Sequence, residues 1–118
     1  MAAAGLFIGW GAPVQGREAK GLEVFSEALA FHGKCQEAGE IETFEVVFLS
    51  PHGGGLARFI LVRASVQQCA ALRAREDFQR TTARAGLVVD DLGDIDALTG
   101  DGVGEQVGIY EEAIAAVA

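Results

Sequence analysis

Residues 42–63 have the sequence ETFEVVFLSPHGGGLARFILVR, and this stretch decides the fold. Its two ends, Glu42–Leu49 and Arg58–Arg63, are rich in the β-branched and aromatic residues that favour strands. Between them, Pro51-His-Gly-Gly-Gly55 is typical of a hairpin turn, because glycine adopts the backbone angles that tight turns need. A connection this short joins antiparallel strands and leaves no room for a crossover helix. The stretch therefore predicts a β-hairpin in an antiparallel sheet.

In front of the hairpin, the sequence predicts a strand followed by a helix. Leu6–Trp10 is short, aromatic and β-prone, and Gly11-Ala-Pro13 ends it. From about Arg17 to Ala38, apolar side chains cover about half of the circumference of a helix. Gly39 then supplies the C-terminal stop.

Behind the hairpin, Ser65 and Gln68 form a capping box, which begins a second helix at Val66. This helix is expected to run toward Ala85, and the acidic pair Glu76-Asp77 within it indicates a kink or two consecutive pieces.

The fourth strand is expected at Leu87–Val89, extending to Leu92 at most, with a further β-prone piece around Ile95–Leu98. A terminal helix follows, because apolar residues from Val103 to Val117 recur at helical spacing. The element order is β-α-β-β-α-β plus a C-terminal helix, in a single domain over residues 1–118. We therefore expect an α+β protein with a ferredoxin-like antiparallel sheet.

The predicted strands are apolar on both faces, although a sheet covered on one side only alternates apolar and polar residues. Val46 and Val47 point in opposite directions, as do Ile60 and Leu61. The two main helices cover one face, so the other needs a cover as well. We expect a second copy of the sheet in a homodimer to supply it, and the alternative is a monomer whose terminal helix folds beneath the sheet.

Four short stretches carry a resemblance to a known family: Gly9-Trp-Gly11, Ile41–Glu45, Pro51–Gly54 and Glu76–Gln79. With the element order, they resemble uncharacterised bacterial proteins of the dimeric α/β-barrel superfamily over nearly the whole chain. The resemblance implies the ferredoxin-like fold and a homodimer, and it implies no particular activity. Characterised members include monooxygenases and isomerases, but the Asn, Trp and His set of the haem-degrading group has no match here, so no site residues are carried over.

The charge balance excludes several classes of partner. Nine Lys and Arg against 17 Asp and Glu give a net charge of −8, which argues against binding nucleic acid or anionic membranes. If the second helix is continuous, Arg73, Arg80 and Arg84 share one side of it. They could bind an anionic ligand, but we favour pairing with the acidic C-terminal segment of the same or a partner subunit.

No pattern for a cofactor or a metal occurs in the sequence. The two histidines, His32 and His52, lack metal-ligand spacing, and the glycine runs at 53–55 and 100–104 lack the features of nucleotide-binding loops. His32 lies within the apolar arc of the first helix, where we expect its ring to donate to a backbone carbonyl. Cys35 and Cys69 form no disulfide framework, so we expect a cytoplasmic protein without a membrane span or signal peptide.

The candidate binding residues are Trp10, His52 and Arg58. Gly9 and Gly11 withhold side chains around Trp10, which could form the wall of a pocket for a flat apolar ligand. In a ferredoxin-like sheet the third strand runs antiparallel beside the first, so the start of the third strand with Arg58 lies near Trp10. His52, in the hairpin, belongs to the same end of the sheet. Sharing an edge of the sheet does not require that the three side chains line one cavity.

Three function classes remain open. The first is a small-ligand-binding dimer with an apolar pocket between sheet and helices. The second is a cofactor-independent monooxygenase or isomerase for a small aromatic or enolisable metabolite, and the third is a structural or partner-binding module. An apolar cavity favours the first class, a polar group inside such a cavity favours the second, and a filled core favours the third.

Overall fold

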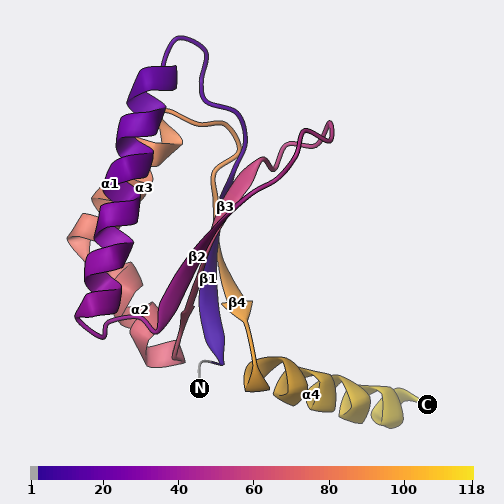
Figure 1. Cartoon of the computed structure of the whole chain (residues 1–118). Coiled ribbons are helices and arrows are strands. Elements are labelled where there is room, and N and C mark those ends of the chain that lie inside the picture. Colours follow the sequence, from indigo (N-terminus) through magenta and orange to yellow (C-terminus); the bar gives the residue numbers. More distant parts are fainter. Residues whose placement is uncertain (1–2) are drawn as a thin grey trace.

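The computed structural model describes residues 3–118, which contain four strands and four helices (Figure 1). In chain order these elements are β1 (Ala4–Trp10), α1 (Glu18–Glu37), β2 (Thr43–Phe48), β3 (Arg58–Ala64), α2 (Val66–Ala74), α3 (Glu76–Gly86), β4 (Gly93–Leu98) and α4 (Asp101–Val117). The strands form one sheet in the order β2-β3-β1-β4, and every neighbouring pair is antiparallel. The predicted α+β class with an antiparallel sheet is confirmed.

The predicted hairpin places β2 and β3 side by side, with Phe48 opposite Arg58. The central strand β1 pairs with β3 on one side, where Trp10 lies opposite Arg58, and with β4 on the other. The expectation that Arg58 lies at the end of the sheet that carries Trp10 is therefore confirmed.

The second predicted helix consists of two pieces, as the alternative with two consecutive helices allowed. The capping box forms, because the Ser65 hydroxyl accepts from the Gln68 amide at 3.0 Å and the Gln68 side chain accepts from the Ser65 amide at 2.8 Å. The helix breaks at Arg75, whose backbone is extended (φ −76°, ψ 133°). The guanidinium of Arg75 pairs with Asp77 at 2.7 Å and with Glu40 at 2.6 Å.

The expected fourth strand at Leu87–Val89 is wrong. The amides of Val88 and Val89 bond to the carbonyl of Ala85 and close the last turn of α3, and Val89 forms only an isolated bridge with Pro13. The strand is β4, which contains the β-prone piece Ile95–Leu98. Aspartate is rare in strands, so Asp94 and Asp96 conceal the signal of β4 in the sequence.

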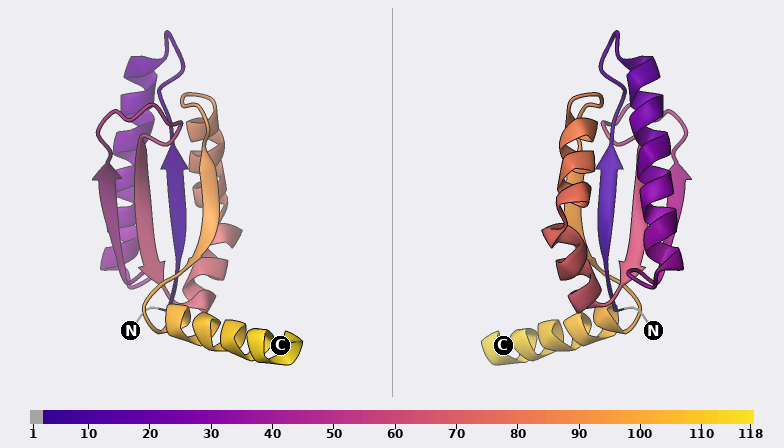
Figure 2. Two further views of the ribbon diagram at one scale, coloured as in Figure 1. Left: turned by 90° about the vertical axis from the view of Figure 1, so that its right-hand side faces the viewer. Right: turned by 90° about the vertical axis from the view of Figure 1, so that its left-hand side faces the viewer.

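Helices α1, α2 and α3 cover one face of the sheet, and the other face is uncovered (Figure 2). On the covered face Leu6, Ile60 and Val62 are buried and form the core with residues of the helices. On the uncovered face Phe7 and Phe59 stack with centroids 4.8 Å apart. The register adds further apolar residues to this face, namely Val47, Leu61, Ile95 and Ala97.

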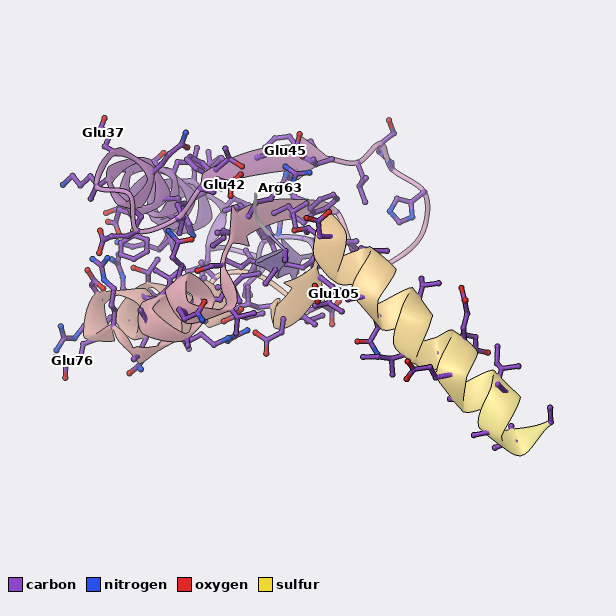
Figure 3. The ribbon with its side chains drawn as sticks, turned by 90° about the horizontal axis from the view of Figure 1, so that it is seen from below. Glu37, Glu42, Glu45, Arg63, Glu76 and Glu105 are labelled. Atoms are coloured by element: carbon purple, nitrogen blue, oxygen red, sulfur yellow. The ribbon has the colours of Figure 1, made fainter. Side chains whose placement is uncertain are left out.

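Helix α4 does not fold beneath the sheet. It leaves the end of β4 and projects on the side of the uncovered face (Figures 1 and 3). Its apolar residues are exposed, including Val107, Tyr110 and Ile114. The Cα radius of gyration is 16.3 Å, against about 13.5 Å for a compact domain of this length. The chain thus leaves both the uncovered sheet face and the apolar stripe of α4 without a cover of its own.

Candidate functional site

A cavity of about 70 Å³ lies between the sheet and helices α1 and α3. Its walls are mainly apolar and include four aromatic rings, those of Trp10, Phe25, Phe31 and Phe78. Trp10 and Phe25 lie with ring centroids 5.8 Å apart, and Phe31 and Phe78 lie 6.2 Å apart. The cavity exceeds the space of about 10–15 Å³ that one water molecule needs.

His32 is a buried polar residue on this wall and is only 3% exposed. Its Nδ1 lies 2.8 Å from the carbonyl oxygen of Ala28. A carbonyl only accepts, so Nδ1 carries the hydrogen, as expected from the sequence, and Nε2 presents a lone pair. Burial lowers the pKa of His32. The bond to Ala28 and the nearby Asp94 carboxylate raise this pKa, but burial has the larger effect, so the pKa lies below the ordinary value for histidine. The ring is therefore neutral near pH 7.

Nε2 of His32 has no hydrogen-bond partner within residues 3–118. Thr81 and Thr82 also line the cavity, but their hydroxyls donate at 2.9 Å to the carbonyls of Asp77 and Phe78 in their own helix. An unsatisfied buried acceptor costs about 1–3 kcal/mol. The wall of the cavity thus contains a buried acceptor that no donor of the described chain satisfies.

A second hollow of about 270 Å³ adjoins the cavity, and we call it the outer hollow. The two share wall residues, namely Trp10, Gly21, Phe25 and Val89. Arg58 lines the outer hollow with its guanidinium carbon 4.8 Å from the ring centroid of Phe48. Glu18 lines it as well. The structure therefore brings Trp10 and Arg58 to one hollow.

His52 lies in the hairpin loop and stabilises that loop. Its Nε2 lies 2.7 Å from the carbonyl oxygen of Leu56 and donates to it, while its Nδ1 accepts from the amide of Gly54 at 3.2 Å. His52 and Arg58 line a third hollow of about 310 Å³, which Trp10 does not line. Arg58 thus borders both hollows, but none of the three hollows described contains the whole trio, whose joint role stays a prediction.

The glycines beside Trp10 serve close packing. A Cβ on Gly9 would lie 2.7 Å from the side chains of Leu56 and Phe7, and one on Gly11 would lie 2.5 Å from the carbonyl oxygen of Gly55. They leave space for these neighbours, whereas the sequence interpretation assigned them to an open surface around Trp10.

The predicted arginine stripe is divided among carboxylates of the same chain. Arg73 pairs with Asp94 at 3.1 Å and Asp96 at 3.0 Å, in agreement with the interpretation that it meets the acidic C-terminal segment. Arg80 pairs with Glu76, and Arg84 pairs with Glu27 of α1. Because the helix breaks at Arg75, these three arginines do not form one anion site.

The cysteines are poor nucleophiles in this structure. Cys35 and Cys69 are buried, and burial raises the pKa of both thiols. The thiolate is the reactive form, so the raised pKa makes both thiols less reactive at neutral pH. Within residues 3–118, no three His, Cys, Asp or Glu side chains gather in a way that could hold a metal ion.

Comparisons with known proteins bear on the fold. No family model matches the chain, and no curated protein matches it. Among solved structures, the chain is similar to a dimeric protein of unknown function and ferredoxin-like fold from Bacteroides fragilis NCTC 9343, with a TM-score of 0.62 and 7% identity over 84% of this chain and 98% of that one. The fold is ferredoxin-like. In the described part of the chain, no helix combines the length and apolar character needed to span a membrane.

Proposed function

We propose that the protein is a homodimer that binds a small molecule in the apolar cavity between the sheet and helices α1 and α3. The observation that carries the proposal is the cavity itself, with aromatic walls and the buried, unpartnered Nε2 of His32. Mostly apolar walls with few polar groups are typical of small-molecule sites. A core built only for stability would fill this space, because voids lose packing energy.

The uncovered sheet face supports the homodimer. Helix α4 and the loop 49–57 project on the same side of the sheet from its opposite ends, and the uncovered face lies between them (Figure 1). Phe7, Val47 and Phe59 lie on that face. A second copy would remove these side chains and the stripe on α4 from water, and apolar patches of this kind mark interaction sites. The similar Bacteroides protein is dimeric.

The test of ligand binding uses Trp10, the one tryptophan of the chain. Its fluorescence is titrated with toluene and with single-ring aromatic acids, and we expect a saturable change in emission because Trp10 lines the cavity. The same titration on the His52→Ala variant tests whether the hairpin histidine belongs to the binding site. Weaker binding by the variant would show that His52 contributes to the site. If no probe changes the emission or the melting temperature, the proposal fails and the structural or partner-binding function gains support.

The second candidate function is a cofactor-independent isomerase or monooxygenase, which the neutral Nε2 of His32 favours. A neutral imidazole in an apolar cavity can act as a base on an enolisable ligand. In an isomerisation, the proton that Nε2 takes from one carbon returns to another carbon of the same molecule. Exchange of the ligand's carbon-bound hydrogen with deuterated water, lost in His32→Leu, distinguishes this function from binding alone.

A further inference from the structure

We infer that α4 pairs with α4 of a second copy of this chain, as two antiparallel helices whose apolar stripes face each other. The inference rests on the proposed homodimer and deepens it, because it names the contact that α4 makes there. It requires no ligand in the cavity. Three features carry it: the spacing of the apolar residues of α4, the fixed direction of this helix, and the positions of its acidic side chains.

The apolar residues of α4 have the spacing of a helix that packs along another helix. They recur after four, three, four and three residues, and all are exposed: Val103, Val107, Tyr110, Ile114 and Val117. We call these five residues the α4 stripe. Ile109 is exposed as well but lies on another side of the helix. A mean spacing of about 3.5 residues keeps the side chains toward one partner helix over the whole length, as in two-stranded coiled coils.

The start of α4 is fixed to the end of the sheet, so the direction of the helix is fixed as well. Gly102 is buried, and a Cβ there would collide with the carbonyl oxygen of Ala3. Thr99 donates from its amide to that carbonyl at 3.1 Å and from its hydroxyl to the carbonyl of Ala4 at 3.2 Å. Between them Gly100 has a φ of 52°, which favours glycine. Helix α4 therefore projects on the side of the uncovered sheet face (Figure 1).

Two subunits that face each other through their uncovered sheets send their α4 helices in opposite directions. Each α4 projects from its own sheet toward the partner, and the two-fold axis of a symmetric dimer lies between the two sheets. The two helices are therefore antiparallel. In the pair that we propose, Val103 lies opposite Ile114 of the partner subunit, and Val107 lies opposite Tyr110 of the partner subunit. Each layer sets a valine against a larger side chain, as well-packed interfaces do.

The acidic side chains of α4 favour this register. Glu105 and Glu112 lie on the side of the helix opposite the stripe and stay in water. Glu111 flanks the stripe, and in the proposed register it lies beside Gly104 of the partner subunit. The next register toward the C-terminus, shifted by one repeat, would bring the two copies of Glu111 together. Like charges at such a contact are unfavourable and select against that register.

The area of the sheet face indicates that a stable dimer needs α4 as well. Four strands of six or seven residues form a face of about 20 Å by 20 Å. Two such faces bury about 800 Å², the upper limit of most crystal contacts, whereas stable interfaces bury about 1,200–2,000 Å². Helix α4 is about 25 Å long and about 10 Å wide, so a pair of them adds about 500 Å². The α4 pair thus brings the interface into the range of stable dimers.

A membrane surface is the other kind of partner that suits an amphipathic helix. Helices that lie on anionic membranes carry Lys and Arg beside the apolar side. Helix α4 carries Asp101, Glu105, Glu111 and Glu112, and it has no Lys or Arg. Its charge therefore favours a second protein chain over a lipid surface.

The experiment places cysteines on the α4 stripe of the full chain. Val103→Cys and Ile114→Cys are produced together in the same cells and also each alone, oxidised with glutathione disulfide, and compared on non-reducing gels. Facing Cα atoms of two helices with axes about 10 Å apart lie about 5.5 Å from each other, within the range of a disulfide. We expect linked dimers when the variants are produced together. We expect none from either variant alone, because the two copies of one position are about 16 Å apart along the antiparallel pair.

Ala115→Cys is the matched control for the cysteine experiment. Ala115 is exposed and follows Ile114 directly, but it lies on another side of the helix. Together with Val103→Cys it should give no linked dimer. The wild type serves as the second control, because Cys35 and Cys69 are buried and should not link the chains.

A second measurement reports the strength of the α4 contact. Ile114→Asp places a charge on the stripe of both subunits, and we expect the dissociation constant of the dimer to rise about a hundredfold, or tenfold for each lost apolar contact. Ala115→Asp is the control and should leave the dissociation constant unchanged. Light scattering over a dilution series measures both variants, and an unchanged constant for Ile114→Asp would contradict the inference.

The outcomes separate this inference from the proposed homodimer. If the wild type has a two-chain mass but the two cysteine variants form no linked dimer together, the homodimer stands and the pairing of α4 with α4 is wrong. A linked dimer from either variant alone would indicate parallel helices and would overturn the antiparallel pair. A single-chain mass for the wild type contradicts both the homodimer and the α4 pair.

Discussion

At the scale of single residues, His32 links the stability of the fold to pH. Burial lowers its pKa in the folded state, whereas an unfolded chain has the ordinary histidine pKa of about 6.5. Below that pH the unfolded state binds more protons, so stability is complete above about pH 6.5 and falls as the pH drops toward the folded-state pKa. We expect the free energy of unfolding of the wild-type protein to decrease between pH 7.5 and 5.

His32→Leu tests this prediction, because leucine has a side chain of similar size that suits a buried position and does not titrate. Chemical denaturation across the same pH range measures the effect, and we expect the variant to lose less stability than the wild type. Equal losses in both proteins would show that other groups cause the pH dependence.

Arg73 is the second residue with a measurable role. It neutralises Asp94, whose side chain is 15% exposed and has a further oxygen without a hydrogen-bond partner in the described chain. Arg73→Gln leaves this carboxylate without its counter-ion, and we expect a loss of about 2 kcal/mol in denaturant unfolding. The control is Arg80→Gln, which breaks the exposed pair with Glu76 and costs less than about 0.5 kcal/mol. Similar losses for both variants would contradict the role of Arg73.

At the scale of the elements, the capping box of α2 gives a prediction. Ser65→Ala removes the hydroxyl that accepts from the Gln68 amide, and we expect it to lower the free energy of unfolding by about 1 kcal/mol. Ser26→Ala, at an exposed position inside α1, is the matched control and should have little effect. Urea denaturation of both variants measures the difference, and a loss below about 0.3 kcal/mol in Ser65→Ala would mean that the cap does not stabilise α2.

The elements that could be predicted from the sequence are those with a local signal. The glycines of the hairpin and the Ser65–Gln68 cap act over a few residues, so β2, β3 and the start of α2 were found. The sequence places the fourth strand too early, at Leu87–Val89, because the aspartates of β4 disfavour a strand locally. In the structure, Asp94 pairs with Arg73 from another element. A partner so distant in sequence leaves no local pattern.

The candidate site also contains one part that the sequence predicts and one part that depends on how distant elements pack. Arg58 lies opposite Trp10 in the sheet. The order and direction of the strands are enough to predict that the two residues lie at the same end of the sheet. The role of His32 in a cavity could not be predicted, because the cavity depends on how α1 and α3 are spaced over the sheet. From the sequence, a histidine in an apolar arc indicates a buried ring that bonds to the backbone, and that half of the interpretation agrees with the bond to Ala28.

At the scale of the whole molecule, the uncovered sheet face gives a prediction about assembly. Val47→Asp places a charge on that face, beside Phe59 on the neighbouring strand. We expect light scattering at micromolar concentration to give a two-chain mass for the wild type and dissociation or unfolding for the variant. Val66→Asp, at the exposed first position of α2, is the control that should leave the dimer intact. A single-chain mass for the wild type would contradict the homodimer.

The most direct measurement is a crystal structure of the full chain grown with toluene, the apolar probe of the fluorescence titration. We expect a dimer joined through the uncovered sheet faces, and in each subunit one toluene molecule between α1, α3 and the sheet, with its ring against Trp10. A cavity filled by the protein's own side chains, with no ligand density beside Trp10, would contradict it.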